Sequence, residues 1–326
     1  MPSTLEDLSP PAREYVAASE EAGLLDRSER GKLSLSGPDA AAFLDSVLSN
    51  DIAALAPGQG ADATLLTHKG RMLAEVRVLK TEEELLLDTE RVALQALFDA
   101  LHQFRIGYHA ELHKRTLEVA LLSLVGPKSD SLLVKTPAAE EFSHVASEVA
   151  GHSVRVVRTL LGLDVFCDAE DREAVWSGLL AAGALPVGEA TFEGIRIEAG
   201  IPRYGVEMDE TTMPQEAGIN ERAVSYSKGC YIGQETVARL YWKGKPNRLL
   251  RGLRFSKPIE SGALLRQNER DVGSVASITA SPRFGLIGLA LLRREVEPGD
   301  ILDVADTTSL ATVVELPFHA TGAERR

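Results

Sequence analysis

The 326-residue chain has little cysteine and none of the common motifs of nucleotide or hydrolase chemistry. Two cysteines cannot build a disulfide framework or a self-contained thiolate metal site. No GxGxxG follows a strand pattern, and GxxxxGK[ST], GxSxG, HExxH and CxxC are missing. We therefore set aside nucleotide-driven, serine-hydrolase and self-contained zinc or iron–sulfur chemistry.

Long apolar runs are also absent. The longest, residues 284–292, has nine residues and includes two glycines, far fewer than a membrane span requires. The first residues, MPSTLEDLSPPAREYVAASEEAG, are acidic and have no apolar core of the kind found in signal peptides. We predict a cytoplasmic protein that has no membrane partner.

Positive charge is scarce, because the formal net charge is −13. Such a balance argues against wholesale nucleic-acid binding. Residues 228–254 are the exception, with seven basic residues against one acid. This basic island suits a local anionic ligand, namely a carboxylate tail, a phosphate or a stretch of RNA. A solvated, charged connector is the alternative.

The most unusual stretch is Lys228-Gly229-Cys230-Tyr231-Ile232-Gly233-Gln234-Glu235. Its two glycines allow a tight turn or a close approach to a ligand. A cation near a thiol favours the thiolate, which is the reactive form, so Lys228 could activate Cys230. We predict that Cys230 is a functional thiol. The alternative is a small buried cysteine in a glycine-rich loop.

Residues 72–80 alternate between apolar and polar positions, as a half-buried strand does. Glu75 and Arg77 share the polar face, which either meets solvent or lines a cavity. The other cysteine, Cys167, ends an apolar run and is expected in the core. The spacings of His102, His109 and His113 straddle Gly107, so we predict surface or capping histidines and no metal site.

The chain up to residue 245 predicts α+β structure. We expect helices over 10–23, 39–50, 90–103, 138–150 and 170–182. We expect strands over 32–36, 61–67, 72–80, 85–88, 117–125, 154–158 and 163–167. After Pro246, six short β-rich segments predict a small, closed antiparallel barrel; they are 249–256, 263–266, 271–279, 286–293, 301–304 and 310–316.

The eight-residue motif resembles the signature of the YgfZ proteins, the folate-binding branch of the YgfZ/GcvT family. Residues 37–51, 57–59 and 66–71 resemble the first helix, the following loop and the hairpin of that family. Residues 196–205 and 213–217 resemble a segment that it shares with the glycine-cleavage T protein. The likeness extends over most of the chain, from residue 24 to residue 318.

The resemblance implies an α+β fold in which two interlocked, ferredoxin-like domains and a C-terminal β-barrel form a ring around a folate site. The domains would be residues 1–245, with subdomains near 1–115 and 116–245, and residues 246–326. The implied cofactor is tetrahydrofolate. The implied role is assembly or repair of iron–sulfur proteins, which would be the partners, with a link to tRNA modification.

The resemblance also implies site residues. Glu198 would hydrogen-bond the pterin ring, since a carboxylate can accept two hydrogen bonds from an aminopyrimidine edge. The other residues expected at the folate site are Arg196, Tyr204, Tyr231, Gln234 and Arg239.

One departure from the T protein concerns its paired aspartates, which are replaced here by Ala74-Glu75. We therefore expect a tetrahydrofolate-binding accessory protein for iron–sulfur enzymes, with Cys230 as its thiol. The alternative is a folate-dependent aminomethyltransferase or demethylase that uses Glu75 as its base. A third hypothesis is an RNA-contacting module that stacks bases on Tyr231, Tyr241 and Trp242.

Overall fold

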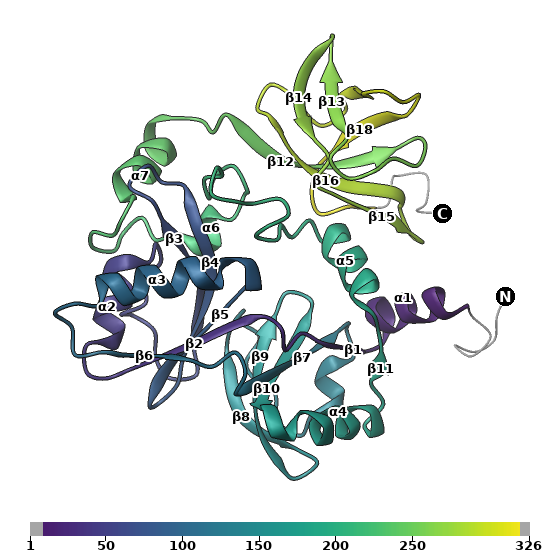
Figure 1. Cartoon of the computed structure of the whole chain (residues 1–326). Helices are drawn as coiled ribbons and strands as arrows, with labels where there is room; N and C mark the ends of the chain where they lie inside the picture. The colour runs from purple at the N-terminus through teal and green to yellow at the C-terminus, as the bar shows by residue number, and fades with distance from the viewer. Residues whose placement is uncertain (1–8, 320–326) are drawn as a thin grey trace.

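The computed structural model describes residues 9–319, which form three β-sheets arranged in a ring (Figure 1). Two sheets carry helices and form the α+β part, and the third forms the C-terminal barrel. Helix α1 (Pro10–Glu20) and helix α5 (Glu189–Glu198) lie side by side where the second sheet meets the barrel. No helix among the described residues is both long and apolar enough to cross a membrane.

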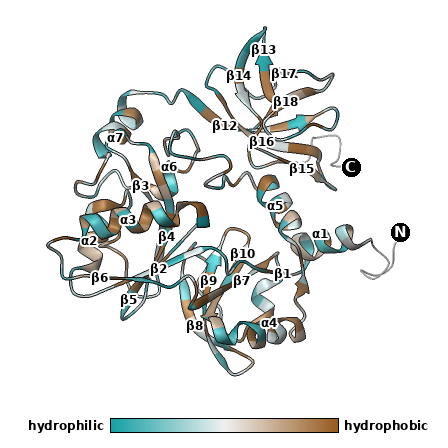
Figure 2. Cartoon of the chain, viewed as in Figure 1, coloured by the Kyte–Doolittle hydropathy of each residue, from teal (hydrophilic) through white to brown (hydrophobic). Residues whose placement is uncertain are grey.

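The first sheet is antiparallel and has the strand order β3-β4-β5-β2-β6. Its strands are β2 (Gly31–Ser36), β3 (Gly60–Leu66), β4 (Met72–Lys80), β5 (Glu84–Thr89) and β6 (Glu111–Lys114). Helix α2 (Ala40–Val47) and helix α3 (Leu94–Phe104), which continues η2 (Arg91–Ala93), pack on the sheet. Helix α3 is amphipathic, since Leu97 and Leu101 are buried while hydrophilic residues face outward (Figure 2).

The second sheet has the order β11-β1-β7-β10-β9-β8 and is antiparallel except for the pair β1–β11. Its strands are β1 (Gly23–Asp26), β7 (Val119–Val125), β8 (His144–Val149), β9 (His152–Thr159), β10 (Gly162–Asp168) and β11 (Leu185–Pro186). The remaining elements here are η3 (Ser129–Leu132), η4 (Ala169–Asp171) and α4 (Arg172–Ala181). Cys167 is buried in the core of this sheet, which confirms its prediction.

The helix predicted over residues 138–150 is wrong, because residues 138–143 are not helical and the following residues form strand β8. Strand β8 forms a hairpin with β9, and the turn between them is Ala150-Gly151. Both turn residues have positive φ, as a tight two-residue hairpin turn requires. Cross-strand pairing therefore outweighs the local helical preference of the segment.

The third sheet is antiparallel and forms the predicted C-terminal barrel, with the order β14-β13-β17-β18-β12-β16-β15. Its strands are β12 (Arg248–Phe255), β13 (Leu264–Gln267), β14 (Arg270–Ser274), β15 (Ser277–Ser281), β16 (Gly285–Arg293), β17 (Ile301–Val304) and β18 (Leu310–Val314). The single strand predicted over 271–279 is two strands. Strand β14 pairs with β13 and β15 pairs with β16, so the chain changes partner at Val275-Ala276.

The α+β part is interlocked, because chain segments cross between its sheets. Strand β1 precedes the first sheet in sequence but belongs to the second. Helix α6 (Asn220–Ala223) and helix α7 (Gln234–Lys243) come after the second sheet in sequence and lie beside β3 and β4 (Figure 1). The division into 1–245, with subdomains near 1–115 and 116–245, and 246–326 remains a proposal.

Candidate active site

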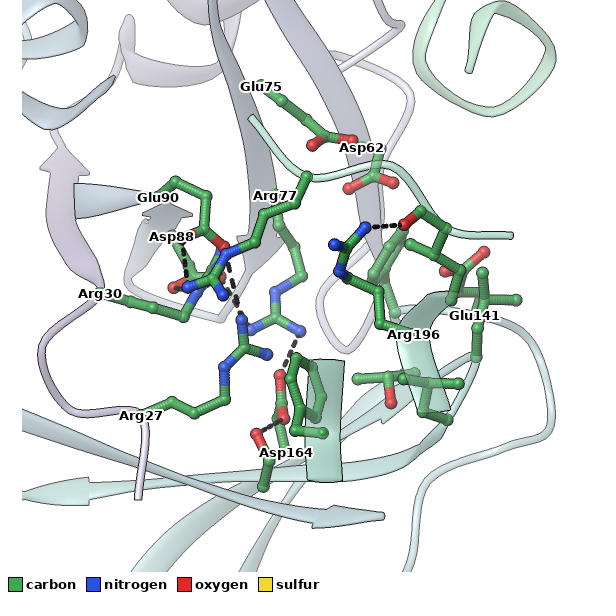
Figure 3. Close-up of a pocket in the computed structure, with 18 of the residues that line it drawn as sticks. Arg27, Arg30, Asp62, Glu75, Arg77, Asp88, Glu90, Glu141, Asp164 and Arg196 are labelled. Carbon is green, nitrogen blue, oxygen red and sulfur yellow. Dashed lines mark hydrogen bonds and ion pairs between the residues drawn. The ribbon is translucent and has the colours of Figure 1, made fainter. Parts of the chain in front are cut away.

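A cavity of about 150 Å³ lies between the first sheet, the second sheet and α5 (Figure 3). Leu160 lines it and is 58% exposed, so the cavity opens to solvent. Charged side chains dominate the lining; they are Arg27, Arg30, Arg77, Arg196, Arg203, Arg222, Asp62, Glu75, Asp88, Glu90, Glu141 and Asp164. Such a density of buried charge is typical of a functional site.

The sequence predicts that the polar face of β4 either meets solvent or lines a cavity. In the structure this face lines the cavity. Glu75 and Arg77 are both lining residues. Ala74, between strand neighbours that face the other way, is fully buried in the core of the first sheet. Of the pair Ala74-Glu75, the second residue is therefore the one that faces the cavity.

Three carboxyl groups surround Arg222 at one side of the cavity, and we call Asp62, Glu75 and Glu141 the acidic group. Arg222 contacts Glu75 at 2.8 Å, Asp62 at 3.2 Å and Glu141 at 3.9 Å. Burial raises the pKa of Glu75 to about 7, with Arg222 opposing the shift. Burial also raises the pKa values of Asp62 and Glu141. A carboxyl group with this pKa can exchange a proton near neutral pH.

Ion pairs on the opposite side of the cavity join the two sheets. Arg77 on β4 contacts Asp88 at 3.0 Å and Asp164 on β10 at 2.6 Å. Arg30 pairs with Asp88 and with Glu90. Burial alone would raise the pKa of Asp88, but Arg30 and Arg77 outweigh it and lower that pKa to about 2. Asp88 is therefore held ionised.

Helix α5 carries two of the predicted site residues on different sides. Arg196 lines the cavity and pairs with Glu193 at 2.6 Å and with Glu207 at 3.0 Å. Glu198 is not among the lining residues; its Oε2 accepts a hydrogen bond from Tyr15 on α1 at 3.1 Å. Two residues span more than half a helical turn, so the two side chains diverge. The structure thus brings Arg196, and not Glu198, to the cavity.

Tyr204 is a buried residue that also lies outside the cavity lining. Its hydroxyl donates to the backbone carbonyl of Met72 at 3.2 Å. This hydrogen bond fixes the loop after α5 to the start of β4, so Tyr204 has a structural role.

The cysteine motif lies at the start of α7 and contributes no residue to the cavity lining. Cys230 is exposed, whereas Tyr231 is 7% exposed. Gln234 donates to the carbonyl of Gly229 at 3.3 Å, within the motif itself. Gly233 has a φ of +82°, and a Cβ there would lie 2.5 Å from the carbonyl oxygen of Thr67. This glycine therefore lets α7 approach the β3–β4 hairpin.

The structure places the side chain of Lys228 against the end of α2. Its side chain is 1% exposed, and its ammonium group donates to the carbonyl oxygens of Asp45, Leu48 and Asn50 at 2.5–3.1 Å. It also pairs with the carboxylate of Asp45 at 3.0 Å. An ammonium has three hydrogens, and these acceptors use them all. Lys228 therefore caps the carboxyl end of α2 and has no donor left for a thiolate.

The basic island is only partly free to bind an anion. Arg248 pairs with Glu216 at 3.0 Å, and Arg254 donates to the carbonyl of Phe284 at 3.2 Å. Among the described residues, Arg239, Lys243 and Lys245 are exposed and form no ion pair.

The three rings predicted to stack RNA bases differ in their exposure. Tyr231 is buried. Tyr241 is 39% exposed and stacks on Tyr226 with ring centroids 3.8 Å apart, and Trp242 is 69% exposed. Stacking of RNA bases on Tyr241 and Trp242 stays a prediction.

Sequence reasoning missed several cavity residues: Arg27, Asp62, Glu141 and Arg222. Asp62 had a signal, because apolar and polar residues alternate in β3 and Asp62 pairs with Arg77 across the sheet. Arg27 and Glu141 lie outside regular elements, and Arg222 lies in the four-residue helix α6, which is too short to show a periodicity. Among residues 9–319 no group of three or more His, Cys, Asp or Glu side chains is arranged to hold a metal ion.

Comparisons with known proteins agree with this architecture. The model of the GCVT N-terminal domain matches residues 8–228. The aminomethyltransferase of Geobacillus kaustophilus is 31% identical over 94% of this chain and 89% of its own length. That of Rubrobacter xylanophilus is 30% identical over 94% and 85%. A putative chloroplastic transferase of Arabidopsis thaliana is 28% identical over 91% and 71%.

A solved structure extends the comparison to the fold. The glycine cleavage system aminomethyltransferase T from Bartonella henselae superposes with a TM-score of 0.83 at 25% identity, covering 94% of this chain and 89% of that one. The predicted α+β ring with its C-terminal barrel is thereby confirmed. By its sequence match over residues 8–228 and its full-length relatives, this chain belongs to the GCVT family.

Proposed function

We propose that the cavity binds tetrahydrofolate and that the protein catalyses transfer of a one-carbon unit, with Glu75 as the proton-transfer group. The observation that carries the proposal is Glu75 itself: a carboxyl group that faces the cavity and whose burial raises its pKa to about 7. The relatives named aminomethyltransferase support the same reaction class.

The lining suits a folate. The aminopyrimidine edge of a pterin offers N–H donors, and the carboxyl groups of Asp62 and Glu141 offer acceptors. Leu160, Leu161 and Phe192 supply apolar surface for the rings. When bound, tetrahydrofolate supplies the nitrogen atoms that carry one-carbon units.

Glu75 can serve as an acid or a base because its two protonation states are close in free energy at neutral pH. Arg222 holds the carboxylate in place by a hydrogen bond of 2.8 Å to Oε1. The pair is partly buried, with side-chain exposures of 27% for Arg222 and 16% for Glu75, which strengthens this interaction relative to one at the surface. Arg222 is therefore a positioning residue for Glu75.

An anaerobic assay for 5,10-methylenetetrahydrofolate, formed from an aminomethyl donor and tetrahydrofolate, tests the proposal. Glu75→Gln should abolish product formation and leave tetrahydrofolate affinity within about threefold of the wild type, since the amide keeps the size of the carboxyl group. Glu118→Gln, on the surface, is the matched control. If no aminomethyl donor yields product, the proposed transferase activity is wrong.

A second candidate function is that of a YgfZ-type accessory protein, in the cytoplasm, for assembly or repair of iron–sulfur enzymes and, through them, for tRNA modification. The observation that favours it is the exposed thiol of Cys230, which precedes α7 and lies outside the cavity. Cys230 could ligate a cluster shared with a client protein or act as a nucleophile.

Complementation tests this second function. Cys230→Ala should keep its affinity for tetrahydrofolate and fail to rescue a strain that lacks the gene. Cys167→Ala is the control for a buried thiol. Full rescue by Cys230→Ala would remove the thiol from the function.

A further inference from the structure

Arg27 is the least satisfied of the six arginines that line the cavity. Its one ion pair is with Glu90 at 3.4 Å, whereas each of the other five contacts at least two carboxylates. Glu90 is also shared, because Arg30 and Arg203 pair with it. Arg27 therefore has guanidinium hydrogens without an acceptor, and its Nε is buried with no hydrogen-bond partner.

Solvent does not compensate this charge. The side chain of Arg27 is 11% exposed, and its guanidinium carbon lies 4.3 Å from the centre of the Phe192 ring, which covers one side of it. Burial and the neighbouring Arg30 lower the pKa of Arg27, although Asp164, Glu90 and Asp88 oppose the shift. A buried donor without an acceptor is costly to leave unpaired.

Arg27 is also aimed at the cavity. It is a lining residue, and Figure 3 shows it across the cavity from Glu75 and Asp62 of the acidic group. The cavity thus has acceptors on one side and, on the other, a forked donor whose one ion pair is with Glu90. A guanidinium fork is matched best by the two oxygens of a carboxylate.

We propose that Arg27 binds a carboxylate group of the ligand that occupies the cavity. The inference rests on the proposed function in taking the cavity as the ligand site, and it adds the chemical class of group that Arg27 selects. Two sources offer this group: the glutamate portion of a folate, and a small amino acid that carries the one-carbon unit on its nitrogen.

Calorimetric titration with two pairs of probes distinguishes these sources. The first pair is tetrahydrofolate and 6-methyltetrahydropterin, which has the reduced pterin ring without glutamate. The second is sarcosine and methylamine, which has the amine without a carboxylate. Arg27→Met removes the guanidinium and keeps an unbranched chain over Phe192. Arg172→Met is the matched control, because Arg172 pairs with neighbouring Asp26 and lies outside the cavity lining.

Arg27→Met should weaken one carboxylate-bearing probe by about ten- to a hundredfold, the loss of a charge-assisted hydrogen bond, and leave its carboxylate-free counterpart unchanged. Loss confined to tetrahydrofolate assigns the carboxylate to folate, and loss confined to sarcosine assigns it to a small amino acid. Equal effects within both pairs, or no effect in either, would overturn the proposal.

Two further measurements keep the result interpretable. Should Arg27→Met fail to fold, Arg27→Lys gives the same comparison with a smaller loss, since lysine keeps the charge without the fork. Failure of 6-methyltetrahydropterin to bind the wild type would contradict the folate site itself. The comparison of sarcosine with methylamine would then still decide the role of Arg27.

Discussion

Arg222 donates a hydrogen bond to Glu75 at 2.8 Å, although the two residues are 147 positions apart in the sequence. Glu75 comes from β4 of the first sheet, and Arg222 comes from α6, which returns to that sheet after the second sheet is complete. The interlocked topology thus supplies the arginine that holds the proposed proton-transfer group.

Glu75 should make the protein less stable as pH rises. Its pKa is raised in the folded state from the ordinary 4.5 to about 7, so the folded protein binds the proton more tightly than the unfolded chain. This contribution is fully favourable below pH 4.5 and is lost as pH rises through 7, a change of about 3 kcal/mol.

Glu75→Gln cannot ionise and should lack this loss. Thermal unfolding of both proteins between pH 5 and pH 8 measures the effect, and the variant should gain stability relative to the wild type over that range. Parallel pH profiles would show that Glu75 has an ordinary pKa.

Asp88 should govern part of the acid stability. Its pKa is lowered from 3.8 to about 2, so its contribution is present above pH 3.8 and lost as pH falls through 2. The free energy of unfolding should drop by about 2 kcal/mol from this group. Asp88→Asn should be less stable than the wild type at pH 7, with a smaller deficit at pH 2. A constant deficit across this range would contradict the ion pairs with Arg30 and Arg77.

Substitution of Lys228 should lower the free energy of unfolding, whereas substitution of Cys230 should leave it nearly unchanged. Lys228→Met leaves the carboxylate of Asp45 and the carbonyls of Asp45, Leu48 and Asn50 without their partner, which should lower the free energy of unfolding by about 3 kcal/mol. Cys230→Ala, on the surface, should change it by less than about 0.5 kcal/mol. Chemical denaturation measures both. If Lys228→Met is as stable as the wild type but its Cys230 thiol no longer reacts, the role of Lys228 would instead be to activate Cys230.

The predicted contact between Glu198 and a pterin can be tested against a residue of the cavity. Glu198 lies outside the lining and accepts from Tyr15, whereas Glu141 lines the cavity. Glu198→Gln should change tetrahydrofolate affinity by less than about threefold, and Glu141→Gln should weaken it by about tenfold or more. The opposite order would place the pterin at Glu198.

The face of a strand on which a side chain lies could be predicted from the alternation of the sequence. The direction in which a long side chain points could not. Alternation in residues 72–80 placed Glu75 and Arg77 on one face of a strand, and the cavity lies on that face. Adjacency placed Lys228 near Cys230, but a lysine side chain is long enough to reach another element, here the end of α2. Arg222 could not be assigned to the site, because only the return of the chain to the first sheet brings it there.

Folate binding in the cavity is tested most directly by anaerobic calorimetric titration with tetrahydrofolate. Three proteins are compared: the wild type, Leu160→Trp at the exposed edge of the cavity, and Leu117→Trp, a control that is 89% exposed and outside the lining. Saturable 1:1 binding to the wild type and the control, weakened at least about tenfold by the bulkier ring of Leu160→Trp, is the predicted result. No binding at millimolar ligand, or equal binding by all three proteins, would contradict a folate site in this cavity.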